Sequence, residues 1–572
     1  MPTSREPALT EIGELLGSLE LENMAALPEL GLLTATYAVG PAQASFWSVL
    51  LADAGLADGG LKSRPGRTIE LYADAVARHA ASDAIALSVL DSRGQFQHLS
   101  FAELDSAASA CSAAWSLEGL EPGQVVALAL PMGIAWVIAF AAALRLGLTV
   151  SCLSSMAEDA QQRRLRALDP KRIVFDPAGP EPAPEFAQRA LLVTRSSTAH
   201  TPPPRAYAPQ QALGKLFSPV REPVDQPVLL SAETAWLWAL RDARFAYRIG
   251  PNLGLALPGF PLEQHQPVAI LASLLAGARF VELPVSAVAR NQTLLAEPFL
   301  TALGVSPELR DTLRRTPAGP LPALRGWFRS IDEPFDWMAW QDFVSKNRLE
   351  AVPTCNLLVD AASGGALLIS ARRPGITHAF AVPSPGVPFV LSDLSGQAAS
   401  STGCGIFNHG AKPDPQAPGW FLLVKRGLEY LYGNTLLPRR AGRIYSEQEV
   451  VECVARLPGV DGACVVPVVS NEPGVGFAFV LVVFAGALPE RAHEALARAA
   501  ECAIAARLGR DFLPNQVLVF PLHARLRGQQ SDAAWCRRQY ATGFLQRKAN
   551  MPVFQRLTAL RAALKEGAVH AR

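Results

Sequence analysis

The stretch VVALALPMGIAWVIAFAAALRLGLTVSCL, residues 125–153, decides the fold. Its first twenty residues carry no charge, which is the length of a membrane-spanning helix. However, Pro131 and Gly133 divide it into a strand-like run, VVALALP, and a helical run that Gly147 closes before the strand-like LTVSCL. A buried strand, a helix and a second buried strand in this order predict a parallel sheet in an α/β protein and not a membrane span.

The same alternation of strands and helices continues on both sides of this stretch. Before it, residues 68–80 have a helical pattern, residues 83–90 a strand-like one, and Ser100 is placed to cap a helix that starts at Phe101. After two proline-rich segments the order is again helix, strand, helix, strand, over residues 229–284. We therefore predict a large, multi-layer α/β domain with mostly parallel, doubly wound sheets.

Composition changes near residues 395–420, which are rich in Ser, Gly and Pro and have little apolar periodicity. The residues that follow show a compact α+β pattern of strands and helices. We predict an N-terminal extension over residues 1–60, a large domain over 61–425 and a small, mobile α+β domain over 427–572.

Charge and cysteine content exclude several classes of function. The 52 Lys and Arg nearly cancel the 51 Asp and Glu, for a net charge of +1 over 572 residues, and no block of basic residues occurs, so we expect no nucleic-acid partner. The eight cysteines are scattered, without a CxxC pair or a zinc-ligand spacing, so we predict no metal site and a reducing, cytoplasmic location. The acidic N-terminus does not match a signal peptide, and we expect no membrane association.

Several segments, taken in order, resemble the adenylate-forming superfamily of acyl- and aryl-CoA ligases from about residue 68 to 530. The first segments are an early helix, turn and strand (residues 100–130) and a Pro-Leu-x-His-like turn (257–283). They are followed by a stretch that aligns with the family's Tyr-Gly-x-Thr-Glu motif (356–365), a hinge with Lys425 and Arg426 (419–427) and the start of the small domain (444–468). The resemblance implies the ligase fold and a pocket for an acyl or aryl group.

The residues with which such ligases hold ATP and Mg²⁺ are missing from the matching positions. The place of the phosphate-binding loop reads DQPVLLSAETAW, without glycine or lysine, so we expect the loop to be deleted and the strand to run straight into the helix that follows. The Thr and Glu of the second motif are Ala361 and Ala362, next to Asp360. The ribose-binding segment has no clear counterpart, and Gln529 stands where the ligases have a lysine, with Lys548 the nearest substitute. We therefore predict no ATP or Mg²⁺ and no adenylation.

A ligase scaffold without ATP chemistry still implies a site where a pantetheine thiol meets an activated acyl group. We predict an acyltransferase that uses an acyl- or aryl-CoA thioester as donor and the phosphopantetheine thiol of an acyl-carrier protein as acceptor. Among known ligase homologues the chain resembles those of this kind, such as the anthraniloyl-CoA to acyl-carrier-protein transferase of aurachin-type biosynthesis. A non-catalytic protein that binds an acyl ligand and an ATP-dependent ligase with displaced catalytic groups remain alternatives.

Five residues are candidates for the site. His265 lies near the family's Pro-Leu-x-His position and is a candidate base, or only shapes the pocket. Cys404 is a candidate nucleophile, and His409, five residues later, is its candidate base. Cys355, which we expect at the end of a strand facing the acyl pocket, is a second candidate nucleophile or only part of the pocket wall. Arg426 is a candidate for the cofactor-binding hinge.

Overall fold

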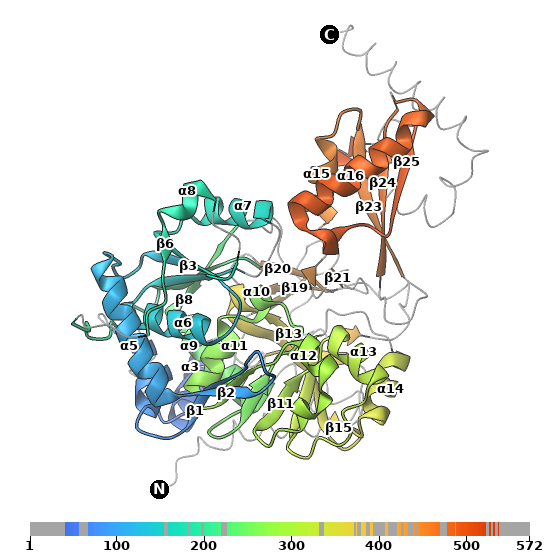
Figure 1. Ribbon diagram of the computed structural model, residues 1–572. Coiled ribbons are helices and arrows are strands. Elements are labelled where there is room, and N and C mark those ends of the chain that lie inside the picture. Colours follow the sequence, from blue (N-terminus) through green and yellow to red (C-terminus); the bar gives the residue numbers. More distant parts are fainter. Residues whose placement is uncertain are drawn as a thin grey trace. The chain divides into compact units, whose positions relative to one another are not determined.

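The structure is a computed structural model (Figure 1). It describes residues 40–56, 67–153, 158–179, 183–195, 200–218, 226–330, 337–370, 373–374, 379–384, 389–392, 407–409, 420–424, 428–432, 439–440, 443–444, 447–469, 477–486, 488–521, 526–527, 530–531 and 536. The chain divides into two compact units: residues 1–155 with 164–436, and residues 156–163 with 437–572. Each unit is described by itself below.

The strand, helix and strand predicted over residues 125–153 are β3 (Val125–Ala129), α6 (Ile134–Leu146) and β4 (Thr149–Cys152). The two strands pair in parallel, and Gly147 ends the helix in the left-handed conformation at φ 71°. Among the described residues, β3 and β4 belong to a six-stranded sheet of order β6-β5-β3-β4-β7-β8. Its other strands are β5 (Arg172–Phe175), β6 (Ala190–Leu191), β7 (Ala212–Leu216) and β8 (Val228–Ser231).

A second, larger sheet of the first unit has the order β18-β16-β14-β13-β12-β11-β9-β10-β1-β2, with β15 paired to β13. The strands from β13 to β1 pair in parallel, whereas β2, β14, β16 and β18 are antiparallel to their neighbours. The bounds are β1 (Ile85–Leu90), β2 (Phe96–Ser100), β9 (Gly254–Ala256), β10 (Arg279–Glu282), β11 (Leu300–Gly304), β12 (Gly326–Ser330), β13 (Pro353–Asp360), β14 (Gly365–Ser370), β15 (Arg373–Pro374), β16 (Ala379–Pro383) and β18 (Phe407–His409).

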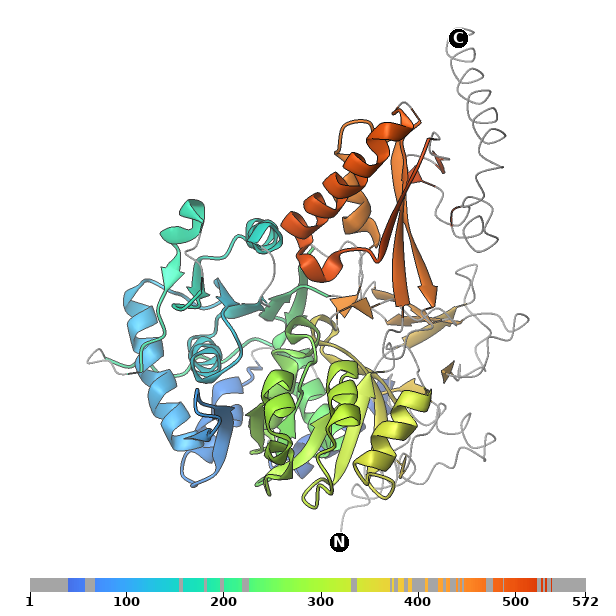
Figure 2. The same cartoon turned by 45° about the vertical axis from the view of Figure 1, so that its right-hand side comes forward.

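Helices cover both faces of the larger sheet (Figure 2). Phe280 and Val281, consecutive residues of β10, belong to two different apolar clusters, as alternating side chains of a doubly covered strand do. The predicted α/β class with mostly parallel sheets is therefore confirmed. The helices of this unit are α3 (Gly40–Asp53), α4 (Leu71–Ala75), η1 (Ala77–His79), α5 (Phe101–Leu117), α8 (Pro184–Ala187), α9 (Ala232–Arg241), η2 (Asp242–Tyr247), α10 (Leu262–His265), α11 (Val268–Leu275), α12 (Val285–Arg290), η3 (Gln292–Ala296), α13 (Pro307–Arg315), α14 (Trp337–Lys346) and η4 (Ala361–Ser363), and α7 (Glu158–Leu168) spans the division between the units.

Helix α3 lies within residues 1–60, the predicted N-terminal extension, of which residues 40–56 are described. Its Phe46, Trp47, Leu50 and Leu51 are buried in the core of the first unit, and the rings of Phe46 and Phe245 stack at 6.3 Å between centroids. This part of the predicted extension is thus core structure.

The second unit has an α+β core. Strands β23 (Gly462–Val469) and β24 (Phe477–Phe484) are antiparallel, and β25 (Gln516–Phe520) joins β24 in parallel. Helices α15 (Glu447–Ala455) and α16 (His493–Leu508) pack on this sheet and share its apolar cluster.

Short elements complete the description. They are β17 (Phe389–Ser392), β19 (Trp420–Val424) and β20 (Leu428–Tyr432) in the first unit, and β21 (Arg439–Arg440), β22 (Arg443–Ile444), η5 (Glu490–Ala492), η6 (Arg510–Phe512), β26 (Leu526–Arg527) and β27 (Gln530–Ser531) in the second. None of the described helices combines the length and apolar character needed to cross a membrane.

Candidate active site at the carboxyl end of β13

The candidate site begins where β13 ends. Ala361 and Ala362, at the positions of the family's Thr and Glu, form the first turn after the strand in η4 and are 0% and 2% exposed. Asp360 is fully buried, and its Oδ2 accepts a hydrogen bond from Ser363 Oγ. One oxygen of the Asp360 carboxylate is therefore engaged within the turn, and the two alanines have no side-chain oxygen with which to bind a metal.

A buried ion pair at the junction of α9 and η2 holds the start of β14, the strand that follows this turn. Arg241 Nε lies 2.8 Å from Asp242 Oδ1, Arg241 Nη2 donates to the carbonyl of Ala366 at 2.7 Å, and Ala366 N donates to Asp242 Oδ2 at 2.7 Å. Burial raises the pKa of Asp242 and lowers that of Arg241, while the attraction between the two charges opposes both changes. Gly365, at φ 141°, makes this close approach possible because a Cβ there would lie 2.1 Å from Asp242 Oδ2.

His265, the candidate base, is the last residue of α10 and is 3% exposed. Its ring packs edge-to-face on Phe260, with 4.8 Å between centroids. The neighbouring Gln264 donates from Nε2 to the carbonyl of Val359 at 2.9 Å, which fixes α10 against the end of β13. The histidine therefore lies beside the turn of Ala361 and Ala362, in an aromatic and buried environment.

Cys355 lies at the other end of β13. It is the third residue of the strand and not its last, so that five residues, or about 17 Å of extended chain, separate it from Asp360. Its side chain is fully buried and shares a face of the sheet with Phe328, its partner in register on β12. The rings of Phe328 and Phe260 lie 6.0 Å apart, so two aromatic side chains lie along the path from Cys355 to His265.

The other candidate residues cannot be placed in this site. Cys404 and Arg426, together with Gln529 and Lys548, lie outside the described residues. His409 ends strand β18, where it pairs with Ala379 of β16. The pairing of Cys404 with His409 and the role of Arg426 remain predictions.

Strand β8 passes directly into helix α9, as the predicted deletion of the phosphate loop requires: β8 ends at Ser231 and α9 begins at Ala232. β7 and β8 form an antiparallel pair in which Leu216 faces Val228, and residues 217–227, FSPVREPVDQP, connect them. The connection contains three prolines, which have no backbone N–H to donate to a phosphate, and neither glycine nor lysine.

Sequence reasoning missed the buried charges around the site. Arg164 of α7 forms an ion pair with Glu263 of α10, two residues before His265, and both side chains are about 95% buried. Arg329 of β12 is also buried and donates from Nε to Asn356 Oδ1 at 2.6 Å. The signal for Arg241 and Asp242 was present as a charged dipeptide inside an apolar helix, AWLWALRDARFAY. No cluster of His, Cys, Asp and Glu that could hold a metal ion occurs among the residues described here.

Comparisons with known proteins identify the fold. Residues 73–229 match the family model described as AMP-binding enzyme. A search among curated proteins finds no match. Three solved structures are similar over most of their length: a double mutant of o-succinylbenzoate CoA synthetase (MenE) from Bacillus subtilis, the amide bond synthetase McbA from Marinactinospora thermotolerans and MatB from Rhodopseudomonas palustris.

The three similarities have low sequence identity and high coverage. MenE is 15% identical with a TM-score of 0.62 over 83% of this chain and 98% of its own. McbA is 17% identical, with a TM-score of 0.60 over 82% of this chain and 99% of its own. MatB is 14% identical, with a TM-score of 0.51 over 84% of this chain and 100% of its own. The chain thus has the fold of the adenylate-forming ligases, and its residues 73–229 carry the sequence pattern of the AMP-binding enzymes.

Proposed function

We propose that this protein transfers an acyl or aryl group from a CoA thioester to the phosphopantetheine thiol of an acyl-carrier protein, without adenylating a carboxylate. The observation that carries the proposal is the turn after β13, where two buried alanines and a carboxylate directed to Ser363 replace the metal-binding residues of the family. The direct passage from β8 into α9, without a loop between them, supports it further. The structure of MenE was solved with its product analogue OSB-NCoA, which supports a CoA thioester as a ligand of this fold.

The reaction conserves the thioester bond. The carrier thiol loses its proton, its sulfur attacks the acyl carbonyl, and the bond from the carbonyl carbon to the CoA sulfur breaks. The proton ends on the CoA thiol, so one thioester and one thiol are consumed and one of each is formed. His265, at the end of α10, is the candidate group for moving this proton. A route through a cysteine intermediate would use Cys404 or Cys355 instead.

One observation favours the non-catalytic alternative. His265 is almost entirely buried and packs against Phe260, as a histidine that only shapes a pocket would. In that case the protein would bind acyl-CoA or another acyl ligand without transferring the group. Binding without transfer in the experiment below would establish this alternative.

The test is transfer in the absence of ATP. Purified protein is incubated with benzoyl-, anthraniloyl- or hexanoyl-CoA and a carrier protein bearing phosphopantetheine, and the mass of the carrier is followed. We expect an acylated carrier and a loss of about 10²- to 10⁴-fold in rate for His265→Ala if His265 is the base. His98→Ala, at an exposed position of β2, is the matched control. Cys355→Ala and Cys404→Ala distinguish the routes through an enzyme thioester.

A second measurement separates the proposal from the ATP-dependent alternative. Robust exchange of pyrophosphate into ATP, with the corresponding carboxylic acids present, would show that displaced groups carry out adenylation and would refute the proposal. The proposed relation to the anthraniloyl transferase of aurachin-type biosynthesis predicts a preference for the anthraniloyl thioester over the other two.

A further inference from the structure

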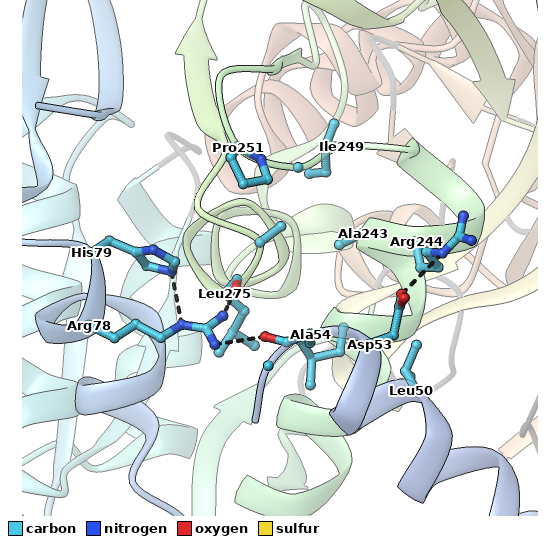
Figure 3. Close-up of a pocket in the computed structure, with 14 residues that line it drawn as sticks. Leu50, Asp53, Ala54, Arg78, His79, Ala243, Arg244, Ile249, Pro251 and Leu275 are labelled. Atoms are coloured by element: carbon cyan, nitrogen blue, oxygen red, sulfur yellow. Dashed lines mark hydrogen bonds and ion pairs between the residues drawn. The ribbon is translucent and has the colours of Figure 1, made fainter. Parts of the chain in front are cut away.

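A cavity of about 490 Å³ lies in the first unit, away from the end of β13 (Figure 3). Its walls come from the end of α3, from η1, from the α9–η2 helix with the turn that follows it, and from the end of α11. Ile249 and Pro251 immediately precede β9, and Leu275 precedes β10, so the cavity lies at the amino ends of these two strands. Its volume is in the range of small-molecule sites, about 300–1,000 Å³.

The cavity and the candidate active site lie at opposite ends of the same sheet. Strands β9, β11, β12 and β13 run parallel to one another, so the amino end of β9 and the carboxyl end of β13 are on opposite sides. A ligand in the cavity would therefore occupy a place separate from the turn of Ala361 and Ala362.

Arg78 is held rigidly at one side of the cavity. Its Nε donates to His79 Nε2 at 3.0 Å, its Nη1 donates to the carbonyl of Ala54 at 3.0 Å, and its Nη2 donates to the carbonyl of Leu275. Figure 3 shows this guanidinium group between the ends of α3 and α11. All three acceptors are uncharged at neutral pH, because burial and the charge of Arg78 lower the pKa of His79 to about 4. The groups that hold Arg78 by hydrogen bonds are therefore uncharged, and the negative charge that acts on it comes from Asp74, outside the cavity lining.

Arg244 supplies a second positive charge at the opposite side of the cavity (Figure 3). Its Nε lies 3.3 Å from Asp53 Oδ2, and both side chains are partly exposed, at 40% and 48%. Within the described residues its Nη atoms have no hydrogen bond or ion pair. The two guanidinium groups and the single carboxylate of Asp53 leave a net charge of +1 on the lining.

Apolar side chains form most of the remaining wall. They include Leu50, Leu240, Ile249, Pro251 and Leu275. An apolar wall next to two guanidinium groups and one carboxylate suits a compound with an apolar body and one negative charge.

We propose that this cavity binds a small carboxylic acid with an apolar body, whose carboxylate pairs with Arg244 and lies in the positive field of Arg78. The inference is independent of the proposed transferase function, because it concerns a different end of the sheet and does not depend on the fate of a thioester. It assigns a role to α3, which closes the cavity with Leu50, Asp53 and Ala54.

The test is calorimetric titration of the full chain with 2-naphthoate and with its neutral analogue 2-naphthamide. We expect the carboxylate to bind at least about tenfold more tightly than the amide, because a charge-assisted pair to a guanidinium group is lost in the amide. Arg244→Gln should weaken naphthoate binding by a similar factor, whereas Arg93→Gln, at an exposed turn, should leave it unchanged. The partly exposed pair with Asp53 contributes little to folding, so Arg244→Gln keeps the protein folded.

Two further variants separate binding in the cavity from binding elsewhere. Gly250→Leu fills the cavity, since a Cβ at Gly250 meets no atom within 4 Å, and should abolish naphthoate binding. Asp53→Asn removes the carboxylate that competes for Arg244 and should tighten binding severalfold. Absence of naphthoate binding, or binding that neither Arg244→Gln nor Gly250→Leu changes, would overturn the proposal.

Discussion

Glu282, the last residue of β10, is a carboxylic acid in an apolar environment. Its backbone lies opposite Val89 of β1 in register, and among the described residues no hydrogen bond or ion pair reaches its carboxyl group. Burial raises the pKa of Glu282 from the ordinary 4.5 to about 7. The protein therefore binds a proton at this position over a pH range in which the unfolded chain has already lost it.

The sign of the effect follows from proton binding. Below about pH 4.5 both states are protonated and the residue does not affect stability. Between about pH 4.5 and 7 only the folded state holds the proton, so stability falls as the pH rises, and above pH 7 the full penalty remains. At about 1.4 kcal/mol for each pH unit, the difference corresponds to about 3 kcal/mol. Because the side chain keeps some contact with water, we expect about 1–3 kcal/mol.

We therefore expect Glu282→Gln to stabilise the first unit by about 1–3 kcal/mol at pH 8 and by much less at pH 5. Guanidinium unfolding followed by tryptophan fluorescence measures this, because nine of the ten tryptophans lie in that unit. Glu121→Gln, at an exposed position, should show no such pH-dependent gain. Equal stability of wild type and Glu282→Gln at pH 8, or a difference that does not change with pH, would refute the reasoning.

Two more substitutions test the energetics of the large unit. Asp242→Asn should destabilise it by about 3–5 kcal/mol in the same unfolding assay, since Arg241 would remain buried without its counter-charge; a loss below 1 kcal/mol would contradict the role given to this pair. Ser100→Ala should cost about 1 kcal/mol, because Ser100 and Glu103 form a reciprocal capping box at the start of α5; an unchanged unfolding midpoint would show that the cap does not contribute.

Local signals in the sequence were sufficient for the elements that the chain builds from neighbouring residues. The division of residues 125–153 into strand, helix and strand was correct because Pro131 and Gly133 interrupt the apolar run and Gly147 supplies the left-handed residue that ends α6. Ser100 was predicted as a cap and accepts a hydrogen bond from Glu103 N at 3.2 Å. Such interactions span three or four residues and can be seen in the sequence.

Interactions between distant segments could not be predicted in this way. Arg164 and Glu263 are 99 residues apart, and nothing in either segment indicates that both charges are buried together. Helix α3 was taken as part of an extension, because its contact with Phe245 of η2 depends on a segment two hundred residues later. Cys355 was expected at the end of its strand, but β13 continues for five more residues.

The candidate site was predicted in part. The comparisons confirm the ligase-like fold, and the two alanines lie in the turn after β13. The burial of His265 follows from its contact with Phe260 in three dimensions, a contact that the spacing of five residues does not specify. The cavity beside Arg78 and Arg244 involves four separate segments and has no signature in any one of them.

The pairing of β1 with β10 makes the order of segments along the chain differ from their order in space. Residues 73–229, which match the AMP-binding family model, supply β1 and β2 to one sheet and the strands from β3 to β8 to the other, while the parallel neighbour of β1 begins only at Arg279. A fragment ending at residue 229 would leave β1 with an open edge and the apolar face of α6 partly uncovered. Shortened versions of this protein should therefore keep β1 and β10 together in one piece.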